Sequence, residues 1–354
     1  MVTMLDYIHE EKTALSAILE KNDSSLHVSY QNMQHVLILA TGSSYNACLA
    51  AKPALESYGD ITVDIQEPYH FNHYGKLSEE VDTVIAVSQS GKSASTVDAI
   101  RKIRSSKRRT IALTGDDQSP ITKEVDQVID LNMGVEKVGF VTKGYSATVL
   151  QLILLGLAIG TSKDRITAAQ KEEKLVQLRE IVMKIPQIIA QTEQFFEKNE
   201  ALFRVAKRFI AIGYGPNWGT AKEFETKFTE TVREPSQGFE LEAYMHGPYL
   251  EANPGHILFF LETDSDSQKR SQRLAQYMKQ YVGQVIVVTT EGETTEGETT
   301  ENQLSLGITS EEDLSVLALV VPIQVLAYKI ATAKGIDLGQ RIFDDFDEVL
   351  KSKI

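Results

Sequence analysis

The sequence predicts an α/β protein made of two similar halves, each a mostly parallel sheet with helices on both faces. Short apolar runs rich in branched residues alternate with helical patterns, which is typical of strands buried in a parallel sheet. This alternation stops at a polar helical stretch and then restarts, so the unit occurs twice. The length of 354 residues also fits about two domains of ~150 residues each.

The first half contains the runs predicted to form the first sheet. These strands are expected at residues 35–40 (HVLILA), 61–65, 83–88 (TVIAVS), 110–114 (TIALT) and 125–131. Helices are expected at about 94–103 and 146–159. The longest apolar stretch, 149–159, is interrupted by Gln151 and Gly156 and is shorter than the ~20 residues of a membrane span, so it predicts a buried helix.

The second half repeats the pattern after a helical connection. Strands are expected at 208–213 (RFIAIG), 256–262 and 284–289, and helices at about 217–233, 267–281 and 315–333. The expected division is an N-terminal helix at 1–25, a first domain at 26–165, the connection at 166–198, a second domain at 199–336 and a tail at 337–354. Residues 289–301 repeat EGETT without an apolar side chain and predict a solvated loop.

Composition excludes several classes of protein. The formal net charge of -13 opposes binding to nucleic acid or an anionic membrane, so a small molecule or a protein is the expected partner. The sole cysteine, Cys48, lies in an apolar helical pattern and is expected to be a core residue. Because one cysteine forms no intrachain disulfide and the first thirty residues lack an apolar signal segment, we expect a cytoplasmic protein.

Two turns combine hydroxyl side chains with the start of a helix. They are residues 41–44 (TGSS) after the first strand and 88–93 (SQSGKS) after the third. Helix N-termini present unpaired amides and positive dipole ends at the carboxyl edge of a parallel sheet, which favours an anion such as phosphate. The alternative is that Ser44 and Ser93 only cap helices. Two such turns at equivalent places favour the anion site, with Gly91 allowing close backbone approach.

Two nucleotide-binding motifs are excluded by spacing. A P-loop needs glycine five residues before Gly91, where Ala86 stands. Gly213 and Gly215 follow a strand, but the next glycine, Gly219, comes one residue too late for the dinucleotide fingerprint. No nucleotide cofactor is therefore expected.

The stretch 217–248 carries candidate acid-base residues. Glu223, Lys227 and Glu230 have helical spacing and are expected on one helix face, which a surface helix also explains. The same stretch continues through Glu242 to His246, which stands in a rigid His-Gly-Pro turn. A carboxylate and an imidazole that act on one small molecule supply proton abstraction next to a carbonyl and ring opening.

The remaining histidines give weaker signals. His70 and His73 have a spacing that suits a metal, but no further His or Cys cluster accompanies them, so a loop or a role in lining the ligand is favoured. His9, His27, His35 and His256 are expected to be structural or on the surface, and no metal is predicted.

Several motifs together resemble the double sugar isomerase (SIS) domain family. They are TGSSYNACLAA, SQSGKSASTVDAIRKIR, VTKGYSATVLQL, EFETKFTETVREP with AYMHGP, and PIQVLAYKIATAKGIDL. Within that family the chain is similar to the isomerase half of glucosamine-6-phosphate synthase and to the fructosamine-6-phosphate deglycases, from about residue 26 to residue 337. The resemblance implies two flavodoxin-like three-layer αβα sandwiches.

The resemblance also implies roles for individual residues. The serine-rich turns bind the sugar phosphate in this family, which implies a phosphate-binding role for Ser43, Ser44, Ser88, Gln89, Ser90 and Ser93. The glutamate that moves a proton between C1 and C2 matches Glu230, and Lys227 matches a lysine one turn before it. The ring-opening histidine matches His246, which in relatives reaches the site of a neighbouring subunit and so implies a homodimer or a higher homo-oligomer.

The chain departs from the synthases in three respects. It begins at the sugar domain, so a complete glutamine-dependent synthase is not expected. The usual SGET turn is SGKS, which places Lys92 where a glutamate is usual. The synthase tail supplies a lysine next to the sugar, whereas this tail has Asp344 and Asp345 in that region and lysines only at Lys351 and Lys353. The acidic tail and the loop around His70 are therefore candidates for substrate selectivity.

The expected function is a cofactor-independent deglycase that cleaves a fructosamine- or glucosamine-type 6-phosphate into an amine and a hexose 6-phosphate. Aldose-ketose isomerisation and deamination of glucosamine 6-phosphate are alternatives on the same scaffold. A further alternative is a regulator that binds a phosphosugar without turning it over. Glu230 and His246 favour an enzyme, and the charge opposes a DNA-reading domain.

Overall fold

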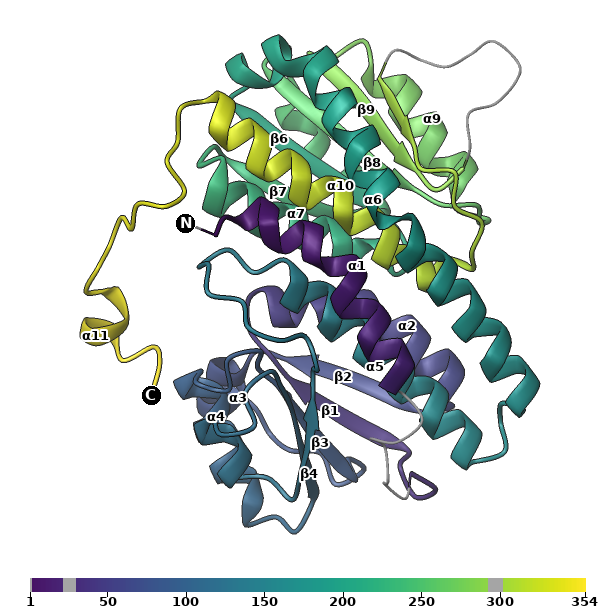
Figure 1. Cartoon of the computed structure of the whole chain (residues 1–354), viewed down its shortest axis with the longest axis vertical. Coiled ribbons are helices and arrows are strands. Elements are labelled where there is room, and N and C mark those ends of the chain that lie inside the picture. The colour runs from purple at the N-terminus through teal and green to yellow at the C-terminus, as the bar shows by residue number, and fades with distance from the viewer. Residues whose placement is uncertain (1, 22–29, 292–301) are drawn as a thin grey trace. The chain divides into compact units, whose positions relative to one another are not determined.

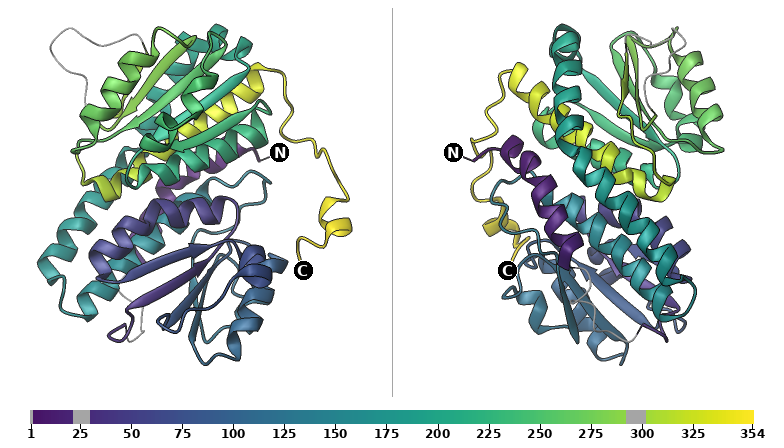
Figure 2. Two further views of the ribbon diagram at one scale, coloured as in Figure 1. Left: turned by 180° about the vertical axis from the view of Figure 1, so that it is seen from behind. Right: turned by 45° about the vertical axis from the view of Figure 1, so that its right-hand side comes forward.

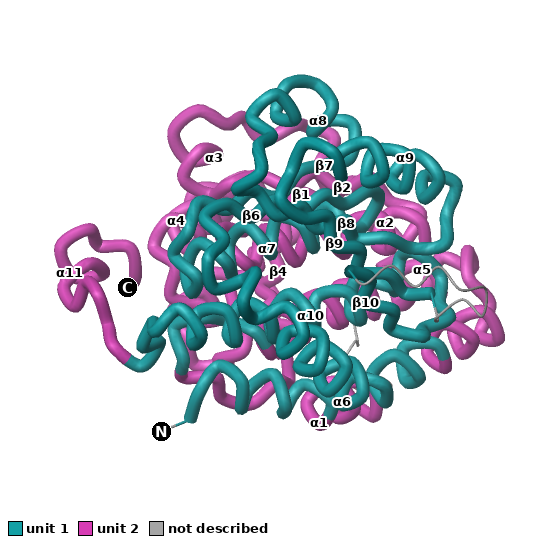
Figure 3. Tube along the Cα trace, turned by 90° about the horizontal axis from the view of Figure 1, so that it is seen from above, with its two compact units in different colours: residues 1–12, 138–142, 177–339 teal, residues 13–137, 143–176, 340–354 magenta. Residues whose placement is uncertain are grey.

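The computed structural model describes residues 2–21, 30–291 and 302–354, which form two compact units. Figure 3 colours them separately: unit 2 comprises residues 13–137, 143–176 and 340–354, and unit 1 comprises residues 1–12, 138–142 and 177–339. Unit 2 contains the sheet of the first half and unit 1 the sheet of the second half. The predicted solvated loop lies mostly outside the described residues.

Unit 2 contains a five-stranded parallel sheet within the described residues (Figure 1). Its strands are β1 (His35–Leu39), β2 (Thr62–Gln66), β3 (Thr83–Val87), β4 (Arg109–Thr114) and β5 (Gln127–Asp130), in the order β2-β1-β3-β4-β5. Its helices are α2 (Ser43–Gly59), α3 (Pro68–Tyr74), α4 (Ala94–Arg104), the 3-10 helix Pro120–Lys123, α5 (Lys143–Ser162) and α11 (Phe346–Leu350). Side chains of α3 and α4 pack with apolar residues of β1, β3 and β4 in one core.

Unit 1 repeats this order with a second parallel sheet (Figure 2). Its strands are β6 (Arg208–Gly213), β7 (Ser236–Glu240), β8 (His256–Glu262), β9 (Gln284–Thr289) and β10 (Gln303–Ser305), in the order β10-β9-β8-β6-β7. Its helices are α7 (Asn217–Thr231), α8 (Leu241–Met245), the 3-10 helix Pro248–Glu251, α9 (Gln268–Met278) and α10 (Glu312–Ala333). Two further helices, α1 (Met4–Lys21) and α6 (Ala168–Val205), contribute residues to both units.

The predicted fold of two parallel α/β halves is confirmed, and two strands were missed. β7 has the sequence SQGFE, which lacks the branched apolar residues that mark the other strands. Its Gly238 is required because a Cβ there would lie 1.9 Å from the carbonyl oxygen of Ala221 on α7. The loop expected around His70 is wrong as well, since Pro68 starts the short helix α3 there.

In the part of the chain that the structure describes, two helices are long and apolar enough to cross a membrane by length and composition, namely α5 and α10. In both, 89% of the apolar window is buried inside the structure. Both are therefore core helices, as predicted for 149–159. Cys48 is also a core residue, and burial raises the pKa of its thiol, which leaves it a poor nucleophile.

The carboxyl edge of the second sheet is acidic and internally hydrogen-bonded. The Tyr214 hydroxyl donates to the carbonyl of Thr263 at 2.8 Å, and the Thr263 hydroxyl donates to Glu312 at 3.1 Å. Glu262, at the end of β8, is buried and accepts a hydrogen bond of 2.7 Å from the hydroxyl of Ser271. Burial raises the pKa of Glu262 to about 7.

This raised pKa predicts a pH-dependent stability. Relative to the ordinary value of 4.5, the folded chain holds the Glu262 proton more tightly, so the carboxyl favours folding below pH 4.5 and this advantage is lost as pH rises to about 7. The loss amounts to about 3 kcal/mol. Glu262→Gln should therefore unfold at a higher urea concentration than the parent at pH 8, with the difference shrinking toward pH 5.

Asp264→Asn is the matched control, because it removes an exposed carboxylate from the same edge. Its urea midpoint should follow the parent at both pH values. An unchanged pH dependence in Glu262→Gln would contradict the assignment.

Candidate functional site

The two serine-rich turns lie next to each other at the edge of the first sheet. β1 and β3 are adjacent and parallel, with Leu39 opposite Ala86, so residues 41–44 and 88–93 leave neighbouring strands at the same edge. In the order β2-β1-β3-β4-β5 the connections diverge between β1 and β3, which is where doubly wound sheets bind ligands. The structure thus brings the predicted phosphate-binding residues of both turns together.

The second turn has a backbone that only glycine allows at residue 91. Gly91 has φ of 62°, and a Cβ at this position would lie 2.0 Å from the Ser119 hydroxyl oxygen. Its amide donates to the carbonyl of Ser88 at 3.0 Å, while the amide of Gly115 donates to the carbonyl of Gln89 at 2.9 Å. The turn is therefore held in one shape from both sides.

The capping explanation for the serines is not what the structure shows. Ser93 precedes α4, but its hydroxyl makes no cap bond and instead accepts from Thr96 at 2.9 Å. The cap of α2 is Gly42, with φ of 60°, and Ser44 lies inside the helix rather than at its cap. The hydroxyls of both turns are thus placed beside helix N-termini without serving as N-caps.

A carboxylate that sequence reasoning missed orients Gln89. The side-chain amide of Gln89 donates to Glu136 at 3.3 Å, and the same carboxylate oxygen accepts from the amide of Gly144 at 2.8 Å. Glu136 therefore links the turn to the first residues of α5. The only sequence signal for this role of Glu136 was that a carboxylate precedes the predicted helix, where it can interact with the helix N-terminus.

The C-terminal tail lies against the second turn. The Ala94 amide donates to the carbonyl of Ser352 at 3.1 Å, and the Ile354 amide donates to that of Lys92 at 3.0 Å. Lys353 and Ser93 pair as an antiparallel bridge between these bonds. The tail thus uses the first amide of α4. Lys92 itself lies 3.7 Å from Asp116, which balances the positive charge expected at this position.

On α7 the predicted acid-base residues share one face. The Lys227 ammonium donates to Glu230 at 2.6 Å and lies 3.7 Å from Glu223. Glu223 and Lys227 are almost fully buried, whereas the side chain of Glu230 is 38% exposed. The arrangement fixes the Glu230 carboxylate by a charge-assisted hydrogen bond and leaves it open to a ligand.

Aromatic packing fixes the orientation of this face of α7. Phe224 and Phe228 stack at 3.8 Å between ring centroids. Phe228 also lies 5.3 Å from Phe209 of β6, and Phe224 lies 5.1 Å from Phe259 of β8. The helix packs closely on β7 as well, where Gly238 leaves room for its backbone. Rotation of α7 would expose these rings, so Lys227 and Glu230 have a fixed direction.

His246 lies at the end of α8 and is largely exposed, at 79% of its side chain. Its nearest ionic neighbour among the described residues is Glu242, at 3.9 Å, and not Glu230. Arg270 of α9 binds Glu242 and lowers its pKa, so Glu242 stays ionised. On the other side of the turn, Arg208 pairs with Glu251 at 2.5 Å. Both flanks of the His246 turn are thus tied to the sheet and to α9.

A cavity of about 640 Å³ in unit 1 is basic for a structural reason. It lies at the C-terminal ends of α6, α7 and α10, where the Lys334 ammonium donates to the carbonyl of Ala206 at 2.6 Å. The Arg204 guanidinium likewise donates to the carbonyl of Ala333 at 2.9 Å, and Glu234 pairs with Lys334 at 2.9 Å. These cations neutralise helix C-termini, which explains them without a ligand.

Within the described residues, no group of three or more His, Cys, Asp or Glu side chains is arranged to hold a metal ion. His70 and His73 lie on α3 and make ring contacts with tyrosines instead. His73 is 4.3 Å from Tyr69 and His70 is 5.5 Å from Tyr74, between ring centroids.

Comparison with curated proteins finds relatives at low identity. One is the glutamine–fructose-6-phosphate aminotransferase [isomerizing] of Caldanaerobacter subterraneus subsp. tengcongensis, 25% identical over 348 residues. Another is the enzyme of that name from Thermotoga maritima, 28% identical over 309 residues. The matches cover 95% and 87% of this chain, and 57% and 50% of the relatives. The chain thus spans about half the length of these relatives.

Comparison with solved structures and family models supports the fold. A candidate phosphosugar isomerase from Clostridium difficile 630 matches with a TM-score of 0.91 and 26% identity, covering 100% of this chain and 99% of that one. Glucosamine-6-phosphate deaminase from Thermotoga maritima matches with a TM-score of 0.74 and 21% identity, covering 95% and 96%. The SIS domain model matches residues 29–160 and 202–333. The chain therefore belongs to the SIS domain family.

Proposed function

We propose that this chain is a cofactor-independent phosphosugar enzyme, and specifically a deglycase for fructosamine- or glucosamine-type 6-phosphates. The observation that carries the proposal is the buried Lys227 ammonium, which holds the accessible Glu230 carboxylate at 2.6 Å. A fixed carboxylate open to a ligand suits proton transfer between adjacent carbons of a sugar. The family resemblance supports the same two residues for this role.

In the proposed reaction the two serine-rich turns bind the phosphate. The residues assigned to it are Ser43, Ser44, Ser88, Gln89, Ser90 and Ser93. The hydroxyls of both turns and the N-terminus of α2 supply hydrogen-bond donors for a dianion, and both helices add a favourable dipole, although the Ala94 amide of α4 already donates to the tail. Because two of these serines serve no capping role, their placement beside the helix starts supports this assignment.

Glu230 and His246 then catalyse the proton transfers of the proposed reaction. His246 opens the sugar ring by proton transfer to the ring oxygen. In a fructosamine 6-phosphate, Glu230 removes a proton from C1 to form the enaminol and returns it to C2, which leaves an imine at C1. Water adds to this imine and the carbon–nitrogen bond breaks, so one adduct and one water give one amine and one hexose 6-phosphate. Lys227 keeps the Glu230 carboxylate in position.

Aldose-ketose isomerisation and deamination of glucosamine 6-phosphate are the second candidate. They need the same proton transfer between C1 and C2, and solved structures similar to this chain include a candidate phosphosugar isomerase and a glucosamine-6-phosphate deaminase. The products distinguish the three reactions, because only the deaminase releases ammonia and only the deglycase releases a substituted amine.

We further propose a cytoplasmic homodimer or higher homo-oligomer in which His246 acts in the site of the partner. The imidazole is 79% exposed and lies 3.9 Å from Glu242, while ion pairs on both sides of its turn hold the turn in place. Such a side chain is available to a second copy of the chain. The net charge of -13 supports a protein that binds neither nucleic acid nor an anionic membrane.

The proposed function predicts release of an amine and a hexose 6-phosphate from phosphorylated sugar-amine adducts. The purified protein is incubated with phosphorylated and unphosphorylated adducts, fructose 6-phosphate and glucosamine 6-phosphate, and products are followed by mass spectrometry. Glu230→Gln should lose ~10² to 10⁴ in rate while its melting temperature stays near that of the parent. Turnover by Glu230→Gln at the parent rate would refute the assignment.

The second turn predicts that Gly91→Ala binds hexose 6-phosphate at least about tenfold more weakly than the parent. The new methyl group meets Ser119 and the left-handed backbone is strained, so the turn must move. Gly134→Ala is the matched control, because φ there is 68° but no atom lies within 4 Å of the added carbon. Isothermal titration measures both variants. Equal affinity of the Gly91→Ala variant and the parent would contradict the prediction.

The shared-site proposal predicts complementation between two inactive variants. Glu230→Gln and His246→Gln chains are each expected to lose at least tenfold in activity. Mixed oligomers should recover activity, because one site of a mixed dimer then contains both Glu230 and His246. The readout is activity after unfolding and refolding the two chains together, compared with each refolded alone. No recovery in mixed oligomers would place His246 in its own chain's site.

A further inference from the structure

We propose that the cavity beside the His246 turn is the subsite for the amine substituent of the substrate, and that it takes a substituent with an apolar part and a carboxylate, as in an adduct of an apolar amino acid. This inference rests on the proposed deglycase function. It adds the chemical class of the amine, which the phosphate turns and Glu230 do not determine.

The cavity is formed by the His246 turn and α9. Its volume is about 300 Å³, at the lower end of the roughly 300–1,000 Å³ of ligand pockets. Met245 and Tyr249, which flank the His-Gly-Pro turn, form one side. The other side comes from α9, through Arg270, Arg273, Leu274, Tyr277 and Met278.

In the proposed reaction, the amine substituent of the substrate extends from the sugar at a position next to His246. An imidazole that opens the ring has to come within about 3 Å of the ring oxygen. The nitrogen of a fructosamine is bonded to C1, which is attached to C2 of that ring, so it lies only a few ångströms from the imidazole. Met245 directly precedes His246 and Tyr249 follows three residues later, so the cavity begins beside the residue that the proposed reaction assigns to the sugar ring.

Apart from Arg270 and Arg273, the side chains that line the cavity are apolar or aromatic. Leu274 and Met278 are buried beneath it, and Met245 is half-buried. Tyr277 is 55% exposed and lies 5.2 Å from the ring of Tyr281, which supports it as a wall. An alkyl or aromatic group would bury its surface against these side chains.

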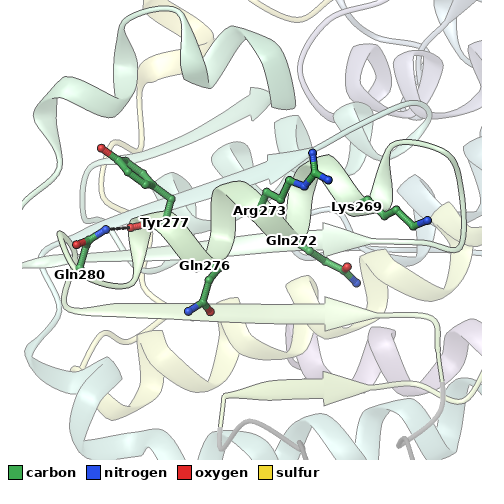
Figure 4. A pocket seen from close by; sticks show the side chains of 6 residues that line it. All are labelled: Lys269, Gln272, Arg273, Gln276, Tyr277 and Gln280. Atoms are coloured by element: carbon green, nitrogen blue, oxygen red, sulfur yellow. Dashed lines mark hydrogen bonds between the residues drawn. The ribbon is translucent and has the colours of Figure 1, made fainter.

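One cation in this apolar setting is available for a carboxylate. Arg270 is neutralised by Glu242. Arg273, in contrast, has no ion pair or side-chain hydrogen bond to any residue that the structure describes. Figure 4 shows Arg273 and Tyr277 projecting from the same side of α9, while Gln272 and Gln276 project from another. A guanidinium beside an apolar floor matches the α-carboxylate of an apolar amino acid.

The adjoining groove along α9 lacks this combination. It shares Arg273 and Tyr277, but its other lining residues are Lys269, Gln272, Gln276 and Gln280. These side chains are long and polar and offer no apolar floor. Lys269 lines this groove and not the cavity. Its substitution therefore removes one positive charge from the same helix and serves as the matched control.

The experiment compares two fructosamine 6-phosphates that differ by one carboxylate, made from leucine and from 3-methylbutylamine. The parent should show about tenfold higher kcat/KM for the leucine adduct, the size expected for one hydrogen-bonded charge pair. Arg273→Gln should remove this preference by slowing the leucine adduct alone. Lys269→Gln should keep it. The oligomeric state of each variant is measured by sedimentation.

Each other result overturns the subsite. Turnover of both adducts by the parent with equal kcat/KM overturns the subsite and leaves the deglycase function standing. Loss of the preference in Lys269→Gln to the same extent shows a long-range charge effect. A changed oligomeric state in Arg273→Gln with the preference retained shows that a second copy covers the cavity. Turnover of neither adduct overturns the proposed function and the subsite with it.

Discussion

The strand order of the first sheet is the constraint on which the candidate phosphate site depends. Because β1 and β3 are neighbours, the turns that follow them leave the same edge side by side although more than forty residues separate them. Any order in which β1 and β3 were not neighbours would separate the turns by at least one strand. Gly91 then makes the second turn compact, and Glu136 orients Gln89 from the start of α5. The placement of the two turns thus follows from the strand order, and the shape of the second turn follows from Gly91.

The predicted acid-base residues Lys227 and Glu230 depend on a different constraint, the packing of α7. Phe224 and Phe228 lie one helical turn apart and pack against Phe259 of β8 and Phe209 of β6, while Lys227 lies on the helix surface that carries Glu223 and Glu230. A buried ammonium is costly unless it is paired, so Lys227 requires its carboxylate partners as much as Glu230 requires Lys227. The hydrophobic core and the charged site are therefore fixed by the same helix.

The sequence predicted what depends on local pattern and missed what depends on tertiary contact. Strands buried on both faces are apolar throughout, so β1, β3 and β8 were recognised, whereas SQGFE in β7 has no such signal. The spacing of Glu223, Lys227 and Glu230 was enough to place them on one face, because helical geometry is local. The contact of Ser352 with the Ala94 amide joins residues more than 250 positions apart, which no period in the sequence indicates. The pairing of Arg270 with Glu242 likewise needed the fold.

The two sheets share one topology but differ at the edge where such folds bind ligands. At the first switch point the side chains are serine hydroxyls, and two helices begin there with glycine-dependent turns. At the second, the Thr263 carbonyl accepts from the Tyr214 hydroxyl and the Thr263 hydroxyl donates to Glu312, and Glu262 adds a buried carboxyl. Carboxylates oppose a phosphate dianion, and their hydrogen bonds already engage the donors nearby. We therefore propose a different role for each half: the first switch point suits the phosphate, and unit 1 carries the predicted acid-base residues Glu230, on α7, and His246, in the turn after α8.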